Sequence, residues 1–182
     1  YIMKKTLFLL LCLLTCFVVG CASESKPLKQ ENTANAAYSV TDDRGKVFNF
    51  TEPPKRMLTT SLAFQDILLE MVPVEHFIAT SISAADPNYS MTADISKKIP
   101  NKYRPRITVE QVLKYKPDLF LTTPLTNPEV SSTLEDMGVK VFMLNQAETY
   151  DDIKKSIVKL GNLVNEKEKS VAILQKMEAG EK

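Results

Sequence analysis

The sequence predicts an α/β fold: a Rossmann-like lobe of about four parallel strands flanked by helices. An N-terminal β-hairpin precedes this lobe, and the start of a long helix ends the chain. From residue 56 onward, short apolar runs alternate with segments whose apolar residues recur at helical spacing. The runs 119–121 and 141–144 are apolar throughout, as expected for strands that helices cover on both faces. Such alternation is typical of parallel βαβ units with right-handed crossovers.

The first element is a hairpin over residues 38–50, "YSVTDDRGKVFNF". Its two halves alternate about the turn residues Asp43, Arg44 and Gly45, and glycine readily takes a positive φ in such a turn. Two prolines in "EPPKR" then interrupt both helix and strand pairing. The acidic pairs 42–43 and 151–152 fit a turn and a helix start, so we assign both pairs structural roles.

Strands and helices then follow in alternation. Thr108 and Asn127 are expected N-caps, Pro128 lies in a first turn, and Gly138 stops a helix. The predicted strands are 56–61, 76–82, 118–123 and 140–145, and the predicted helices are 63–72, 108–115, 127–138, 149–164 and a last one that starts at Asn165.

The N-terminal segment indicates export. Lys4 and Lys5 precede an apolar run over 7–19 that is shorter than the ~20 residues of a bilayer-spanning helix. Residues 1–20 are therefore a predicted signal peptide. The residues "VVGC" resemble the lipobox of bacterial lipoproteins, which predicts a lipid on Cys21 and a flexible tether over 21–37. An ordinary secretory signal and an uncut membrane anchor are the alternatives.

Composition limits the function classes. All three cysteines lie at or before Cys21, so the processed chain would contain no disulfide. Removal of residues 1–20 leaves 21 of the 23 basic residues against 22 acidic ones, and this balance predicts no nucleic-acid partner. His76 is the only histidine, and neither a phosphate-binding glycine loop nor a nucleophile elbow occurs. We therefore predict no enzyme, no metal site and no cofactor.

Polar residues end the predicted strands, where parallel sheets bind ligands. They include Ser61, Ser81 and Thr123. The stretch "NKYRPR" adds Arg104 and Arg106, whose guanidinium groups suit carboxylate or phosphate, and Tyr103, which offers an aromatic face. Either it is a solvated loop, or it forms the anion-recognising edge of a ligand cleft, with Tyr89 as a second aromatic candidate.

These segments together resemble periplasmic-binding proteins for ferric siderophores, cobalamin and haem. The hairpin followed by "EPPKRMLTTS" resembles the family's opening, and "TVEQVLKYKPDLFLTT" resembles its signature stretch. Glu110, Pro117, Asp118 and Leu119 stand at the matching positions. "LEDMGVKVFMLN" and the helix after it also fit, so the resemblance covers residue 38 to the end of the chain.

The resemblance implies a two-lobed receptor that is held by a lipid outside the cytoplasm and delivers its ligand to an ABC permease with its ATPase. Residues 38–164 would be the N-terminal lobe, and 165–182 the start of the interlobe helix in a truncated chain. In the family, a glutamate at the position of Glu129 docks on the permease. An acidic residue in a first helical turn is also favoured by the helix dipole.

The departures from the family concern the ligand. "KYRPR" replaces a glycine-containing run, and Thr123 stands where cobalamin binders often carry an aromatic residue. Both differences favour an anionic ligand such as a ferric siderophore over cobalamin. A single-domain surface lipoprotein that binds a protein partner is the main alternative function, and an enzyme on a Rossmann-like fold is the third.

Overall fold

The computed structural model describes residues 37–180. The predicted signal peptide, Cys21 and the tether up to residue 36 lie outside the described residues. Between residues 37 and 180, no helix has the length and apolar character needed to cross a membrane.

The predicted hairpin is confirmed. Strands β1 (Tyr38–Thr41) and β2 (Val47–Phe50) pair antiparallel, and Gly45 in their turn has a φ of 84°. The Tyr38 and Phe50 rings stack with their centroids 5.2 Å apart. The Tyr38 hydroxyl donates to the Leu163 carbonyl over 2.9 Å, which joins the hairpin to a helix near the end of the chain.

Five parallel strands follow in the described part of the chain: β3 (Met57–Thr59), β4 (Ala79–Ser81), β5 (Asn101–Tyr103), β6 (Leu119–Thr122) and β7 (Val141–Met143). Ladders join β3–β6–β7 and β4–β5, and a parallel bridge between Met57 and Phe77 links the two groups. The strand order is therefore β5–β4–β3–β6–β7. This is the order of a doubly wound Rossmann sheet, and it reverses direction between β3 and β6.

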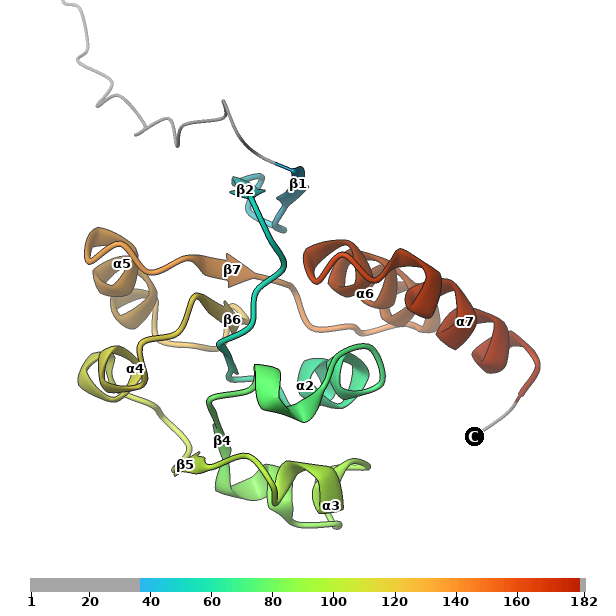
Figure 1. The fold of residues 1–182 in the computed structure, drawn as a ribbon, viewed down its shortest axis with the longest axis horizontal. Coiled ribbons are helices and arrows are strands. Elements are labelled where there is room, and N and C mark those ends of the chain that lie inside the picture. The colour runs from blue at the N-terminus through green and yellow to red at the C-terminus, as the bar shows by residue number, and fades with distance from the viewer. Residues whose placement is uncertain (1–36, 181–182) are drawn as a thin grey trace, which may run out of the picture. The chain divides into compact units, whose positions relative to one another are not determined.

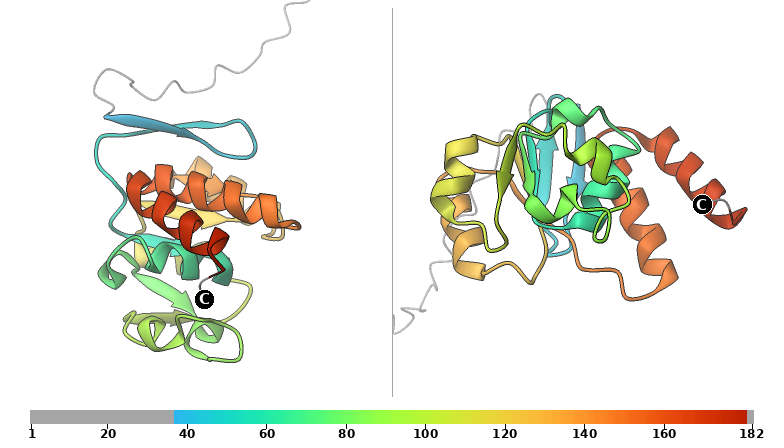
Figure 2. Two further views of the ribbon diagram at one scale, coloured as in Figure 1. Left: turned by 90° about the vertical axis from the view of Figure 1, so that its right-hand side faces the viewer. Right: turned by 90° about the horizontal axis from the view of Figure 1, so that it is seen from below.

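Helices cover both faces of the sheet (Figures 1 and 2). One face carries α2 (Leu62–Leu69) and α6 (Tyr150–Leu163), and the other carries α4 (Val109–Tyr115) and α5 (Pro128–Asp136). The short helices η2 (Val74–His76), η3 (Ile82–Ala85) and α3 (Ala93–Ser96) lie in the connections around β4, and α7 (Lys167–Glu178) packs against α6.

Adjacent residues of the strands contribute to two hydrophobic cores, one on each face of the sheet. Leu119, Leu121 and Phe142 face the side of α2 and α6, whereas Phe120 and Val141 face α4 and α5. All five side chains are fully buried. Because adjacent residues of a strand point to opposite faces, a sheet covered on both sides needs continuous apolar runs, which explains the pattern that predicted these strands.

Two details differ from the expectations. Asn101–Tyr103, part of the stretch that we treated as a loop, forms β5. Only Tyr103 of this strand is buried, so no alternating apolar pattern indicated it. The last helix starts at Lys167 and not at Asn165, because Asn165 takes a left-handed φ of 57° that separates α6 from α7.

The turn of the hairpin is anchored on β7. The buried Asp42 carboxylate accepts backbone N–H groups from Arg44 at 2.9 Å, Lys46 at 3.0 Å and Met143 at 3.3 Å. The Arg44 guanidinium pairs with Asp42 at 2.7 Å and donates to the Val141 carbonyl over 2.6 Å. Burial opposes the charge on Arg44, but its contacts with Asp42 and Glu135 outweigh this and raise its pKa. One carboxylate thus fixes both the turn and its place on the sheet.

A glycine sets the approach of α6 to α7. A Cβ atom at Gly161 would lie 2.5 Å from the Ser170 Cβ and 2.7 Å from its Oγ. Real Cβ atoms do not come so close, so the two helices meet at a distance that only glycine permits at this position.

Replacement of Asp42 by alanine is expected to lower the free energy of unfolding by about 3 kcal/mol. The change leaves three backbone N–H groups without their acceptor and Arg44 without its buried partner. Urea unfolding followed by circular dichroism measures this loss. Glu52→Ala, which removes an exposed ion pair with Lys55, serves as the control and should barely move the midpoint. Equal effects of the two changes would contradict the anchoring role of Asp42.

Gly161→Ala is expected to destabilise the protein by roughly 1 kcal/mol. Overpacking costs about 1–3 kcal/mol, and the better helix propensity of alanine returns at most about 1 kcal/mol. The same substitution in a Ser170→Gly background should lose this penalty, because the opposing Cβ is gone. A double-mutant cycle by thermal unfolding tests the contact, and additive effects would show that the two residues are not coupled.

Candidate functional site

The candidate site is a groove at the carboxyl ends of the parallel strands, where the strand order reverses. Polar side chains converge there from β3, β6 and the loop after β6. The Thr60 hydroxyl lies 3.1 Å from those of Thr122 and Thr126, and the Thr122 hydroxyl donates to that of Thr126 over 2.6 Å. Ligands of doubly wound folds bind at this kind of reversal.

Tyr103 links the ends of β5 and β3 at the bottom of the groove. It stands at the end of β5, is 5% exposed, and its hydroxyl donates to the Thr59 carbonyl at the end of β3. Burial raises the pKa of Tyr103, and the nearby Tyr115 adds to this. The phenol therefore stays neutral at physiological pH and holds the ends of β5 and β3 at a fixed separation.

The groove has a volume of about 970 Å³ and is walled by the first turns of α4 and α5. Its charged lining residues are one cation, Arg106, and two acids, Glu110 and Glu129. Hydroxyl groups dominate the remaining polar lining: Thr60, Ser81, Ser83, Tyr103, Thr108, Thr123, Thr126 and Thr133. The groove is therefore rich in hydrogen-bonding groups without an excess of positive charge.

Several of these polar residues also cap helices. Ser81 accepts the Ser83 N–H over 3.3 Å, and Thr108 accepts that of Gln111 at the start of α4. Asn127 accepts the Glu129 N–H over 3.0 Å at the start of α5. The helices begin at the same edge of the sheet at which the strands end, so polar residues of the connecting segments must satisfy free N–H groups of first helical turns.

Arg106 has the most unusual backbone of the lining residues. Its φ of 70° lies in the left-handed region, which non-glycine residues rarely adopt. It follows Pro105 and lies two residues before the cap of α4, so the loop turns sharply there. Such strained residues concentrate at functional sites. Arg106 is also the only cationic side chain among the residues that line the groove.

The structure brings together four of the predicted ligand or docking residues: Ser81, Arg106, Thr123 and Glu129. Three others lie apart from the groove lining. Ser61 caps α2 by accepting the Phe64 N–H over 3.3 Å. Arg104 is exposed, and Tyr89 is 68% exposed in the connection between η3 and α3.

Sequence reasoning missed Thr126 as part of the site. The polar ends of the predicted strands were a signal for Thr60, which directly precedes Ser61, and the stretch "NKYRPR" was a signal for Tyr103. The contact of Tyr103 with Thr59 could not be predicted, because it spans 44 positions of the chain. Among residues 37–180, no group of three or more His, Cys, Asp or Glu side chains is placed to hold a metal ion.

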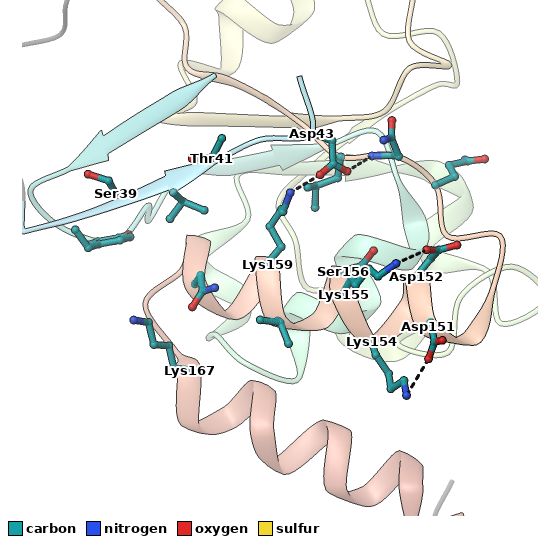
Figure 3. A pocket seen from close by; sticks show the side chains of 17 residues that line it. Ser39, Thr41, Asp43, Asp151, Asp152, Lys154, Lys155, Ser156, Lys159 and Lys167 are labelled. Atoms are coloured by element: carbon teal, nitrogen blue, oxygen red, sulfur yellow. Dashed lines mark hydrogen bonds and ion pairs between the residues drawn. The ribbon is translucent and has the colours of Figure 1, made fainter. Parts of the chain in front are cut away.

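A second groove, of about 920 Å³, runs between β1 and α6 (Figure 3). Its lysines are largely paired with acids: Lys154 with Asp151 at 2.9 Å, Lys155 with Asp152 at 3.3 Å, and Lys159 with Asp43. These contacts leave little uncompensated charge for a ligand in this second groove.

Solved structures share this fold. The fold is that of a lobe of the periplasmic-binding proteins, which confirms at the level of the fold the resemblance seen in the sequence. No protein-family model and no curated protein matches the chain.

The similar structures are binding proteins with different ligands. An ABC-type Fe3+-hydroxamate transport system from Saccharomonospora viridis has a TM-score of 0.64 at 18% identity, over 78% of this chain and 53% of its own. A periplasmic heme-binding protein from Pseudomonas aeruginosa has 0.56 at 20%, over 65% and 41%. The molybdate-binding MolA from Haemophilus influenzae has 0.63 at 13%, over 76% and 49%. The chain thus spans about half the length of these structures.

Alkaline pH is expected to destabilise the protein through Tyr103. The pKa of Tyr103 is higher in the folded protein than in the unfolded chain, where it is ~10. The buried neutral phenol therefore stabilises the fold fully below pH ~10, and this stabilisation is lost as the pH rises above that value. Burial also raises the pKa of Tyr38, to about 12, with the Asp118 charge adding to the effect.

Urea unfolding between pH 8 and 11 measures this dependence. Tyr103→Phe should lower stability at pH 8, because the hydrogen bond to Thr59 is lost, and should flatten the decline at higher pH. Lysine titration affects the unchanged protein and the Tyr103→Phe variant alike. The difference between their slopes of unfolding free energy against pH therefore reports on Tyr103 alone. Identical slopes for the two proteins would contradict this assignment.

Proposed function

We propose that the protein is the substrate-binding lipoprotein of an ABC importer, and that it captures an iron complex, a ferric siderophore, for delivery to a membrane permease. The observation that carries the proposal is the groove at the reversal between β3 and β6. Its volume of about 970 Å³ lies within the ~300–1,000 Å³ of ordinary small-molecule sites.

The lining chemistry supports an oxygen-rich ligand. Hydroxyl groups such as those of Thr60, Thr123 and Thr126 can donate to ligand oxygens and accept from ligand hydroxyls. Arg106 adds a guanidinium group, which can donate two parallel hydrogen bonds to a carboxylate or hydroxamate. A siderophore complex offers oxygen atoms of both kinds around its iron.

The groove is open on one side, which supports a two-lobed receptor. Leu125 lines the groove and is 77% exposed, an unusual position for a large aliphatic side chain unless another surface covers it. The part of this chain that matches covers only about half of each similar solved structure. We propose that residues 38–164 are the N-terminal lobe, that the interlobe helix starts within the segment 165–182, and that a second lobe closes over the groove.

Attachment and docking complete the proposal. A lipid on Cys21, after removal of residues 1–20, would hold the protein on the extracytoplasmic side of the membrane through a tether over 21–37. Glu129 is exposed in the first turn of α5, at the rim of the groove. A carboxylate there can pair with arginines of a permease that approaches the open end of the groove.

The intact protein should bind a ferric hydroxamate such as ferrichrome and quench its tyrosine fluorescence, a suitable signal because the chain contains six tyrosines and no tryptophan. Cobalamin should give no response. Arg106→Glu should weaken binding at least tenfold, whereas Arg104→Glu, outside the groove lining, is the charge-matched control and should bind as the unchanged protein does.

Haemin and molybdate complete the ligand panel. Saturable quenching by haemin without a response to ferrichrome would replace the siderophore by haem. A lack of response to every iron complex, including a response to molybdate alone, would overturn the proposed function. Equal binding by the Arg104 and Arg106 variants would remove Arg106 from the site.

A further inference from the structure

A third hollow lies at the opposite edge of the sheet, among the amino ends of the strands. Arg56 directly precedes β3, Ile78 directly precedes β4, and Asn101 is the first residue of β5. The hollow has a volume of about 520 Å³. It is lined by Arg56, Val74, Glu75, Phe77, Ile78, Lys98, Pro100, Asn101, Lys114 and Tyr115.

Positive charge predominates in this hollow. Arg56, Lys98 and Lys114 line it from three separate segments, and Glu75 is the only acid among the lining residues. This contrasts with the groove at the carboxyl ends, where Arg106 is outnumbered by two acids. The side chains that line the two hollows therefore differ in the sign of their net charge.

Two of the three cations have no partner in the part of the chain that the structure describes. The Lys98 and Lys114 side chains are exposed and make neither an ion pair nor a hydrogen bond between residues 37 and 180. Most other lysines around the sheet are occupied, for example Lys55 with Glu52, Lys97 with Asp94 and Lys46 with Glu135. Unpaired cations on two facing segments are available to an external anion.

Arg56 is held in place as the third cation. Its Nε donates to the Lys116 carbonyl over 3.1 Å, and one Nη donates to the Tyr115 carbonyl over 2.8 Å. The Asp118 carboxylate accepts the Arg56 N–H over 3.0 Å. These bonds occupy the last carbonyls of α4, which would otherwise repel an anion, and leave the guanidinium with donors to spare.

We propose that this hollow binds a phosphate group. A phosphate carries up to two negative charges and presents oxygens in several directions, which suits one fixed guanidinium and two mobile ammonium groups from separate segments. The group can belong to a free phosphorylated solute or to a phospholipid head. The site faces away from the groove, so it remains open when the groove is occupied, and it does not depend on the proposed transport function.

The test follows amide resonances of the ¹⁵N-labelled protein during titration with inorganic phosphate at low salt. Asn101 and Tyr115 should shift saturably, and added salt should weaken the effect because the site is exposed. Cosedimentation with vesicles of phosphatidylglycerol, and of phosphatidylcholine as a neutral control, tests the lipid source. The double variant Lys98→Gln/Lys114→Gln should weaken binding at least tenfold.

The double variant Lys167→Gln/Lys176→Gln removes the same charge from exposed positions at the start and end of α7 and should bind as the unchanged protein does. Phosphate-induced shifts that only the first double variant loses would establish a site for a free phosphate. Cosedimentation that only this variant loses, without such shifts, would establish a lipid-headgroup site. Failure of both assays, or equal losses in the two double variants, would overturn the proposal.

Discussion

Parallel strands place all of their carboxyl ends at one edge of the sheet and all of their amino ends at the other. Each crossover must therefore traverse a face of the sheet, and helices there require strands that are apolar on both sides, as Leu119, Phe120 and Leu121 are. The first helical turns meet at the carboxyl edge. Their free N–H groups require side-chain oxygens, which residues such as Ser81, Thr108 and Asn127 supply. The polar character of the groove follows from this constraint before any ligand is considered.

Local signals in the sequence predicted the elements that depend on local contacts. Thr108 accepts the Gln111 N–H and Asn127 accepts the Glu129 N–H, so each helix start depends on a hydrogen bond that spans two or three residues, and both starts are as predicted. Strand β5 was missed because it is short and buries only Tyr103, so its sequence resembles a polar loop. The Asp42–Asp43 pair was correctly placed in a turn, but its bonds to β7 reach across about 100 positions, beyond what a pattern in one segment can indicate.

The same division between local and distant contacts applies to the site. Strand ends could be located from the apolar runs, and therefore Ser81 and Thr123 were found. Which of two adjacent polar residues points into the groove depends on strand register and on helix capping. Ser61 serves the cap of α2 while its neighbour Thr60 joins the hydroxyl cluster, and Arg104 lies outside the groove lining that includes Arg106. The cluster itself required the strand order, since β3 and β6 are adjacent in space but some 60 residues apart in sequence.

The contact between Gly161 and Ser170 fixes the position at which α7 crosses α6. Twelve residues of helix extend about 18 Å, so a rotation of a few degrees at the crossing displaces the far end of α7 by an ångström or more. The absence of a single methyl group at position 161 thus sets the direction of α7 from the lobe. Because α6 packs on α2 and the sheet, α7 is connected through α6 to the core that carries the strands.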